Sequence, residues 1–392
     1  MHFLLPAGGA HGSITRKPNP DAAPAATAAL LTEGSMDPKS VYLSRPWLKF
    51  YEPGVPANPE VPLKSVPQAF DEATTLYGAK TALVFYGREI SFRELRDHTD
   101  RLAAALAGFG LKKGDRVGLY LLNSPQFVIA YFAALKIGCT VTPISPVYTS
   151  HEVKFQLENS GARVMICQDI LFDKVEKSGA KLDHIIVTNV SEYLPGLKKF
   201  LGKSFLGKIF GDIKVGTPDI PKRSNVHQFQ DLLARAFVPP PAVDINPRTD
   251  IAALPYTGGT TGNPKGVMLT HYNIISAQVS GRAAFPGFEE GKEVIMAFLP
   301  FFHIFGQVVL MLNGLTQGHT LVLFTTPDTE GILEAMEKYK ATVFYGVPTL
   351  YEYLKDHKDT GKVNWKRLKF LVSGADTLHE STMKEWTKRT GS

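Results

Sequence analysis

The chain has 392 residues, of which 44% are hydrophobic, so it is long enough for a substantial core and for two or three packed units. Its formal charge of +6 permits attraction to polyphosphates, anionic lipids or nucleic acid but does not choose among them. No stretch approaches the roughly 20 apolar residues of a membrane-spanning helix, which argues against a transmembrane protein. The two cysteines, Cys139 and Cys167, lie in apolar runs and are too few for a disulfide framework. We therefore expect buried, reduced thiols and a cytoplasmic protein.

The first residues differ in composition from the rest of the chain. Residues 1–35 are rich in Ala, Pro, Gly and Thr, and they lack the basic region and the apolar core of a secretory signal. A segment of this kind cannot bury enough apolar surface to fold. We predict a disordered N-terminal extension at 1–35, with ordinary composition beginning at Met36.

From about residue 80, short β-branched and aromatic runs alternate with stretches of helical periodicity. A first series of expected strands covers 81–87, 116–122, 140–145, 163–167 and 184–188. A second series covers 251–257, 294–300, 320–324, 341–346 and 368–374. Near-continuous apolar strands separated by helices are typical of parallel sheets covered on both faces. The fold class is therefore predicted to be α/β, with layered parallel sheets covered by helices.

Capping signals mark two of the expected helices. One begins after Ser91, where Glu94 completes a capping box, and it ends near Gly110, a position typical of a C-terminal glycine. The other is led by Ser150.

A Gly, Lys and Pro-rich interval at 191–248 interrupts the alternation of strands and helices. We interpret it as a connecting insertion between a first α/β subdomain at 36–190 and a second at 249–392. Its basic residues alternate with apolar ones, which would suit a helix lying on a membrane surface, but its glycines weaken any helix and favour a solvated insertion. The lysines concerned are Lys198, Lys199, Lys203 and Lys208.

The stretch YTGGTTGNPKGVMLTH, Tyr256 to His271, lies between an expected strand and an expected helix. Its glycines can adopt positive φ and bring backbone N–H groups to a polyphosphate, its threonines supply hydroxyls, and Lys265 adds a positive charge. A Walker A loop needs Gly before the lysine and Ser or Thr after it, whereas Pro264 and Gly266 stand there. The pattern therefore indicates a phosphate loop of another class.

The segment TGGTTGNPKG resembles the signature of the AMP-forming acyl-CoA synthetases, the superfamily that also contains firefly luciferase and peptide-synthetase adenylation domains. The resemblance implies a large N-terminal domain of the luciferase type, present incompletely, in which this loop grips the β and γ phosphates of ATP. It gives Thr257 a Mg²⁺ ligand role and Lys265 a catalytic one. The residues that it assigns to ATP binding are Thr257, Gly258, Gly259, Thr260, Thr261, Gly262 and Lys265.

A second resemblance is LPFFHIFG, Leu299 to Gly306, placed after an expected strand. In the family its histidine, His303 in this chain, lies beside the substrate carboxylate and the α-phosphate, which implies a catalytic and substrate-binding role. An imidazole can donate a hydrogen bond to oxygens where negative charge develops. We expect the flanking side chains to keep the site dry; these are Phe301, Phe302, Ile304 and Phe305.

Two further segments, YGVPTLYEYL at 345–354 and LVSGAD at 371–376, resemble the family's next two strand ends. The resemblance places Tyr345 and Gly346 on the acyl side of the site. Asp376 departs from the family, where many members carry a small or apolar residue, and a strand-terminal turn is the alternative interpretation. The residues assigned to the adenine and the acyl tunnel are Ser373, Gly374 and Ala375.

The resemblance covers about residues 60–392 and implies activation of a fatty acid by ATP, with Mg²⁺, to an acyl adenylate. Coenzyme A then takes the acyl group and AMP is released, as in a long-chain fatty acid:CoA ligase. An aryl or medium-chain acid is an alternative substrate, and a non-catalytic acyl- or nucleotide-binding fragment or a membrane-associated scaffold is an alternative role. Nucleic-acid binding is not indicated, because the basic residues are scattered.

Elements that the family carries beyond these motifs do not occur before Ser392. They are a Tyr-Gly-x-Thr-Glu element whose glutamate holds Mg²⁺, a hinge, and a C-terminal lid domain with a catalytic lysine. We therefore expect little or no ligase activity and weak ATP binding from these 392 residues. An exposed apolar sheet edge would favour self-association, for instance as a homodimer, and peripheral contact with the inner face of a membrane is also considered.

Overall fold

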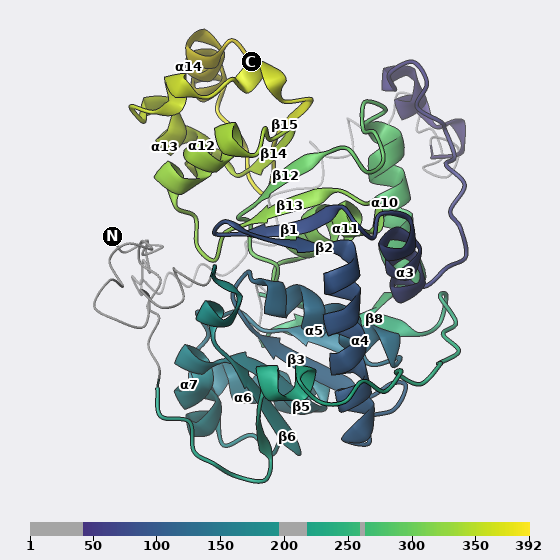
Figure 1. Ribbon diagram of the computed structural model, residues 1–392. Helices are drawn as coiled ribbons and strands as arrows, with labels where there is room; N and C mark the ends of the chain where they lie inside the picture. The colour runs from purple at the N-terminus through teal and green to yellow at the C-terminus, as the bar shows by residue number, and fades with distance from the viewer. Residues whose placement is uncertain (1–41, 196–217, 259–262) are drawn as a thin grey trace, which may run out of the picture. The chain divides into compact units, whose positions relative to one another are not determined.

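The computed structural model describes residues 42–195, 218–258 and 263–392, which belong to two compact units, Met1–Pro53 and Gly54–Ser392 (Figure 1). The described part of the first unit contains the 3₁₀ helix η1 (Pro46–Phe50), with proline at its start. The extension predicted at 1–35 lies outside the described residues. Within the described ranges, no helix is both long and apolar enough to cross a membrane.

The second unit is built on two mainly parallel sheets. The six-stranded sheet has the order β15 (Phe370–Ser373), β14 (Val343–Gly346), β12 (Val294–Ala297), β13 (Thr320–Leu323), β1 (Thr81–Phe85) and β2 (Arg88–Ser91). The seven-stranded sheet has the order β11 (Leu269–Thr270), β8 (Ile251–Ala253), β4 (Thr140–Pro143), β3 (Arg116–Tyr120), β5 (Ala162–Gln168), β6 (His184–Thr188) and β7 (Val226–Gln228). Only β2 and β11, each at a sheet edge, pair antiparallel within these two sheets.

Every strand expected from the sequence is present, and the α/β fold class is confirmed. The stretch 251–257 divides into β8 and the short β9 (Tyr256–Thr257). The sheets do not follow the expected subdomains, however. Strand β1 pairs with β13, and β8 pairs with β4, so each sheet takes strands from both 36–190 and 249–392. Strand β7 lies inside the expected insertion at 191–248 and extends the seven-stranded sheet.

The helices cover the sheets as the alternation predicts. Their bounds are α3 (Val66–Leu76), α4 (Phe92–Gly108), α5 (Pro125–Lys136), α6 (Ser150–Ser160), α7 (Phe172–Ser178), α9 (Phe229–Leu233), α10 (His271–Ala284), the π-helix η4 (Phe305–Leu312), α11 (Asn313–Thr316), α12 (Thr329–Lys338), α13 (Pro348–Asp356) and α14 (Glu380–Thr390). Short 3₁₀ turns lie at η2 (Asp169–Leu171), η3 (Val190–Tyr193), η5 (Thr360–Lys362) and η6 (Trp365–Arg367).

Two predicted helix starts need correction. Ser91 caps α4 by accepting a hydrogen bond from the Glu94 backbone N–H, but the Glu94 carboxylate pairs with Arg88 at 2.8 Å, so the capping box is half formed. The complete box belongs to α6, where Thr149 rather than Ser150 is the cap and Glu152 bonds back to the Thr149 N–H. The three-residue spacing that a capping box requires is met by the threonine.

The end of α4 is as predicted. Gly110 has φ of 81°, and its N–H donates to the Ala107 carbonyl at 2.9 Å, while the Leu111 N–H donates to the Leu106 carbonyl at 3.4 Å. This pair of bonds is a Schellman motif, which needs the left-handed conformation that glycine adopts without steric cost.

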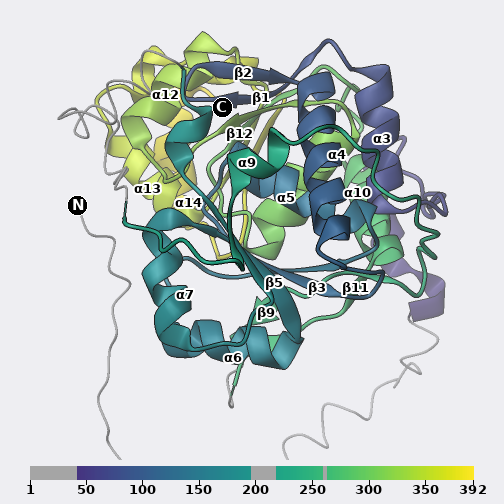
Figure 2. The ribbon, with the colours of Figure 1, turned by 60° about the horizontal axis from the view of Figure 1, so that its bottom comes forward.

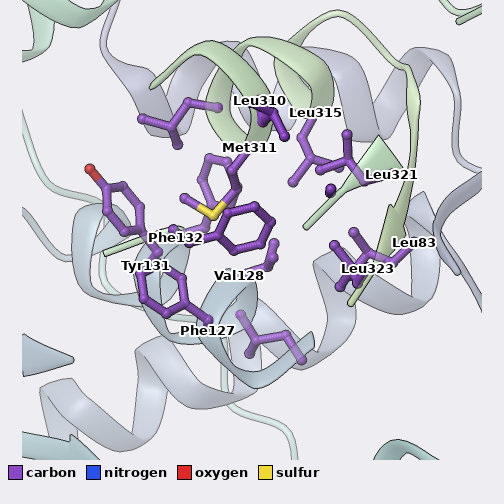
Figure 3. Close-up of a cluster of buried hydrophobic side chains, with 14 of the residues drawn as sticks. Leu83, Phe127, Val128, Tyr131, Phe132, Leu310, Met311, Leu315, Leu321 and Leu323 are labelled. Carbon is purple, nitrogen blue, oxygen red and sulfur yellow. The ribbon is translucent and has the colours of Figure 1, made fainter. Parts of the chain in front are cut away.

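The core is centred on α5, whose residues Pro125 to Leu135 are all buried. Its sequence is apolar around the whole circumference, which is typical of a helix covered on all sides. Figure 1 shows α5 between the two sheets, and Figure 3 shows Phe132 and Val128 facing the side chains of Met311 and Leu315 from η4 and α11. Burying side chains of this size stabilises the fold by about 1.5–3 kcal/mol each.

Both cysteines are buried and unpaired, as predicted. Burial raises the pKa of the Cys139 thiol to about 12 and also raises that of Cys167. Thiols of this kind are poor nucleophiles at neutral pH, because the thiolate is the reactive form.

Two buried histidines each accept a backbone hydrogen bond from another part of the fold. His271 Nδ1 accepts the Val66 backbone N–H at the start of α3, and His319 Nδ1 accepts the N–H of Glu293 at 3.4 Å. Desolvation by burial lowers the pKa of each ring from 6.5 to about 4. Both rings are therefore uncharged in the folded protein at neutral pH.

These two rings predict a loss of stability in mild acid. Between about pH 6.5 and pH 4 the unfolded chain takes up protons that the folded chain does not, so the free energy of unfolding falls as the pH falls through this window. Urea denaturation at several pH values measures the slope. Replacing His319→Gln should make the slope shallower, and an equal slope in that variant and the wild type would contradict the assignment.

Candidate active site

The predicted phosphate loop is a β-hairpin. Strand β9 pairs antiparallel with β10 (Lys265–Gly266), which sets Thr257 opposite Lys265, and both residues are exposed. The Tyr256 hydroxyl donates to Asn159 Oδ1 of α6 at 2.5 Å, and Figure 2 shows β9 beside α6. Four residues assigned to ATP binding lie outside the described residues: Gly259, Thr260, Thr261 and Gly262.

The hairpin differs from the expected strand, turn and helix in two ways. After β10 the chain returns to the seven-stranded sheet through β11 before α10 begins, so the loop does not lead directly into a helix. Gly258 and Gly266 do not have positive φ. Gly266 is instead favoured by packing, because a Cβ atom there would make a tight contact of 3.0 Å with the Tyr256 ring.

The segment LPFFHIFG forms a tight loop between β12 and η4. The His303 N–H donates to the Pro300 carbonyl at 3.1 Å, and the His303 carbonyl accepts the Gln307 N–H at 2.9 Å. Gly306 fits there because a Cβ atom would lie 2.2 Å from the Pro300 carbonyl oxygen. Gly306 therefore permits the close backbone approach that places His303 in this loop.

The His303 ring is held in one orientation by the backbone. Its Nδ1 accepts the Phe305 N–H at 3.3 Å, so in the neutral ring the proton sits on Nε2, where it can be donated to a substrate oxygen. The expected dry surroundings are only partly formed. Phe301 is fully buried, but His303 is exposed and Ile304 is 38% exposed. The described residues alone do not exclude water from this ring.

Three of the sequence motifs meet at one end of the six-stranded sheet. The Phe305 and Tyr345 rings make an edge contact at 5.9 Å between centroids, and a Cβ atom on Gly374 would lie 3.1 Å from the Phe305 ring. The Gly374 N–H donates to the Gly346 carbonyl at 3.1 Å. Because β12, β14 and β15 are parallel, the segments that follow them converge at their carboxyl ends, where α/β proteins commonly bind ligands.

A cavity of about 230 Å³ lies along this cluster, between α10 and η4. Burial raises the pKa of the Tyr345 phenol to about 12, so it stays neutral. Aromatic and aliphatic side chains make up most of the wall. Its lining comprises Ala277, Gln278, Gly281, Arg282, Phe285, Phe288, Phe305, Val308, Val309, Asn313, Gln317, Tyr345 and Val372.

The residues of the segment 373–376 do not all lie at this cavity. Val372 lines the cavity, whereas the Ser373 side chain lines a separate groove of about 720 Å³ with Tyr351 and Trp386. Successive residues of a strand face opposite sides of the sheet, which separates Val372 from Ser373. Ala375 is exposed with φ of 73°, and Asp376 Oδ1 accepts the Thr377 N–H at 2.7 Å, which is the arrangement of a turn.

Asn123 is a positioning residue that the sequence analysis did not single out. It follows β3, is 5% exposed, and reaches across to the other sheet. Its amide nitrogen donates to the Leu299 carbonyl at 2.8 Å, and its amide oxygen accepts the Phe301 N–H at 2.8 Å. The signal was a polar pair, Asn123 and Ser124, between an apolar strand and an apolar helix.

The hairpin and the His303 loop belong to different sheets. Among the described residues, no hydrogen bond or ion pair joins Thr257 or Lys265 to the loop at 299–306. Of the residues assigned to the substrate, the structure brings together Tyr345, Gly346 and Gly374 beside Phe305, whereas among the described residues no hydrogen bond joins the His303 ring to them. The ATP-binding role of the hairpin stays a prediction.

The pair of mainly parallel sheets, with a largely apolar cavity at the carboxyl ends of the strands, is consistent with the comparisons with known proteins. The profile of the AMP-binding enzyme family matches residues 70–392, and the chain belongs to this family. The long-chain-fatty-acid–CoA ligase of Bacillus subtilis (strain 168) is 34% identical over 352 residues, covering 88% of this chain and 61% of that protein. The ligase of the same name from Salmonella typhimurium is 33% identical over 359 residues, covering 89% and 62%. The chain thus spans less than two thirds of these relatives.

Solved structures share the fold. A long-chain-fatty-acid-CoA ligase from Archaeoglobus fulgidus matches with a TM-score of 0.69 and 25% identity, covering 87% of this chain and 63% of that one. The N-terminal domain of FACL13 from Mycobacterium tuberculosis matches with a TM-score of 0.67 and 20% identity, covering 83% and 73%. The expected fold, that of the large domain of adenylate-forming ligases, is confirmed.

Asn123→Leu tests the junction between the sheets. The substitution leaves buried backbone groups of the His303 loop without partners, so we expect the free energy of unfolding to fall by about 1–3 kcal/mol. Denaturant titration measures this loss. Asn123→Asp keeps the acceptor for the Phe301 N–H and should recover part of it; equal stability of the wild type and the leucine variant would refute the role.

Proposed function

We propose that this chain carries the acid-activating part of an ATP-dependent long-chain fatty acid:CoA ligase. The observation that carries the proposal is the largely apolar cavity beside Phe305 and Tyr345, since Phe305 follows His303 by two residues in the chain. A hydrocarbon chain suits an apolar wall of this kind, and its carboxylate would then lie toward the His303 loop. The curated relatives named as long-chain-fatty-acid–CoA ligases support the same substrate class.

The proposed chemistry has two transfers. A carboxylate oxygen attacks the α-phosphorus of ATP, the bond to pyrophosphate breaks, and an acyl adenylate forms. The thiol of coenzyme A then attacks the acyl carbon and AMP leaves. Neither transfer needs a protein nucleophile, so positioning and electrostatics supply the catalysis. His303 Nε2–H would stabilise the charged oxygens, and Lys265 with the hairpin N–H groups would hold the departing pyrophosphate.

The residues available for Mg²⁺ favour binding through the nucleotide. Between Tyr256 and Gly266 the sequence contains hydroxyls but no carboxylate. Mg²⁺ in nucleotide sites is commonly held by substrate phosphates, water and one or two protein oxygens. The Thr257 hydroxyl fits the last of these roles, and the phosphates of ATP would supply most of the remaining ligands.

An aryl acid is the second candidate substrate. The cavity wall contains several aromatic rings, and the 4-coumarate–CoA ligase 1 of Oryza sativa is 29% identical over 299 residues, covering 74% of this chain and 48% of that protein. A medium-chain acid or a non-catalytic binding role remains an alternative. Assaying dodecanoic, hexadecanoic and coumaric acids side by side separates these substrates.

Membrane contact and homodimer formation belong to this proposal only as predictions. Residues 196–217, which include the lysines at 198, 199, 203 and 208, lie outside the described residues. The groove lined by Ser373, Tyr351 and Trp386 is the apolar surface at β15 on which self-association would depend.

Acid-dependent exchange of labelled pyrophosphate into ATP tests the proposal. In a version that also carries the Tyr-Gly-x-Thr-Glu element and the lid domain, we expect exchange with a long-chain acid. We expect a loss of about a hundredfold or more on Lys265→Ala or His303→Ala in that version, because each removes a group that stabilises transition-state charge. Lys181→Ala and His151→Ala are matched controls on exposed residues outside the site and should keep the wild-type rate. Wild-type rates in the Lys265 and His303 variants would refute these roles, and saturable ATP binding without exchange would favour the non-catalytic alternative.

A further inference from the structure

The cavity of about 230 Å³ beside Phe305 extends along the strands of the six-stranded sheet. Phe305 and Tyr345 mark one end, because their rings meet near the carboxyl ends of the strands. Phe288 marks the other end, because its ring lies 5.9 Å from that of His319, the residue before β13. In the register of β13, β12 and β14, His319 is level with Ala341, four residues before Tyr345, which is a separation of roughly 13 Å.

The Phe288 ring is held in place at its end of the cavity. It stacks on Phe370, the first residue of β15, with ring centroids 4.3 Å apart. The loop that carries Phe288 is tied to the end of α11, since the Gly291 N–H donates to the carbonyl of Gln317, another lining residue, at 2.9 Å. A ring with these contacts forms a fixed wall of the cavity.

Gly281 of α10 leaves space in the wall of the same cavity. Apart from its own turn of helix and the adjoining residues, no described atom lies within 4 Å of the place that a Cβ atom would take there. Ala277 and Phe285, one helical turn before and after it, also line the cavity, so this position faces the cavity. The φ of Gly281 is not positive, and glycine inside a helix weakens that helix relative to alanine. Neither backbone geometry nor a close contact therefore explains this glycine.

We propose that Gly281 and Phe288 together determine the length of the acyl chain that this cavity accepts. The inference rests on the proposed function, since it takes the cavity to hold the acyl chain. The missing side chain at Gly281 lets the acyl chain pass along α10, and the Phe288 ring stops it near the amino ends of the strands. Ligand pockets commonly enclose roughly 300–1,000 Å³, so a cavity of about 230 Å³ has little spare room, and one side chain added or removed changes it substantially.

Two substitutions should move the preferred chain length in opposite directions. Gly281→Leu fills the open space, so we expect acids that are too long for the remaining space to bind about tenfold or more weakly, while shorter acids are retained. Phe288→Ala removes the end wall, so we expect longer acids to gain affinity relative to shorter ones.

The matched control is Gly108→Leu. Gly108 is an exposed helical glycine of α4 that also has no described atom within 4 Å of a Cβ position, but it does not line the cavity. This variant should keep the length preference of the wild type, so it separates an effect on the cavity from a general effect of adding leucine to a helix.

Equilibrium dialysis of radiolabelled octanoic, dodecanoic and hexadecanoic acids against the whole chain measures the dissociation constant of each acid. The readout is the ratio of the constants for the longest and the shortest acid that bind, compared between each variant and the wild type. Thermal melting checks that the variants fold; if Gly281→Leu or Phe288→Ala does not, Gly281→Val or Phe288→Leu takes its place.

The outcomes separate this inference from the proposed function. Opposite shifts of the ratio in the Gly281 and Phe288 variants, with none in the Gly108 control, support the inference. An unchanged ratio in either variant, an equal weakening of every acid, or the same shift in the control overturns it and leaves the acyl site intact. Failure of every acid to bind the wild type overturns both the inference and the assignment of the cavity to the acyl chain.

Discussion

The enclosure of α5 between two sheets is the constraint on which the rest of this structure depends. A helix with no polar face must be covered on every side, and neither sheet alone can do that. The two sheets are consequently held in one core that includes residues of η4 and α11. Asn123, directly before this helix, bonds to the loop that carries His303. The loop that carries His303 is thus held at the same junction that organises the core.

This construction divides the proposed chemistry between the sheets. The hairpin that bears Thr257 and Lys265 continues from β8 of the seven-stranded sheet. Tyr345 lies in β14 of the six-stranded sheet, and His303 and Gly374 follow strands of that sheet. Bringing an acid and a nucleotide together therefore depends on how the sheets are set against each other. The buried contacts between them matter for positioning as well as for stability.

Much of the fold could be predicted from sequence because parallel strands buried on both faces are near-continuous apolar runs. The pairing of the strands could not be predicted, because β1 pairs with β13, which lies more than two hundred residues further along the chain. The site was partly predictable for the same reason. Motifs after parallel strands converge, but the face of a side chain depends on alternation, and this separated Ser373 from the cavity that Val372 lines. The polar pair after β3 marks Asn123 as unusual, but its partners lie on the other sheet and no local pattern names them.

The π-helix η4 has a consequence for how this family can vary. Its hydrogen bonds span one residue more than those of an α-helix, so it holds a residue that an α-helix of the same length would not. Deleting one residue would remove this surplus and let the segment relax to α-helical form, so the residues on either side of η4 would keep their register. Val308 and Val309, which lie inside η4 and line the cavity, would shift instead, while both sheets kept their strands. A single codon lost or gained here would reshape the cavity without redesigning the domain.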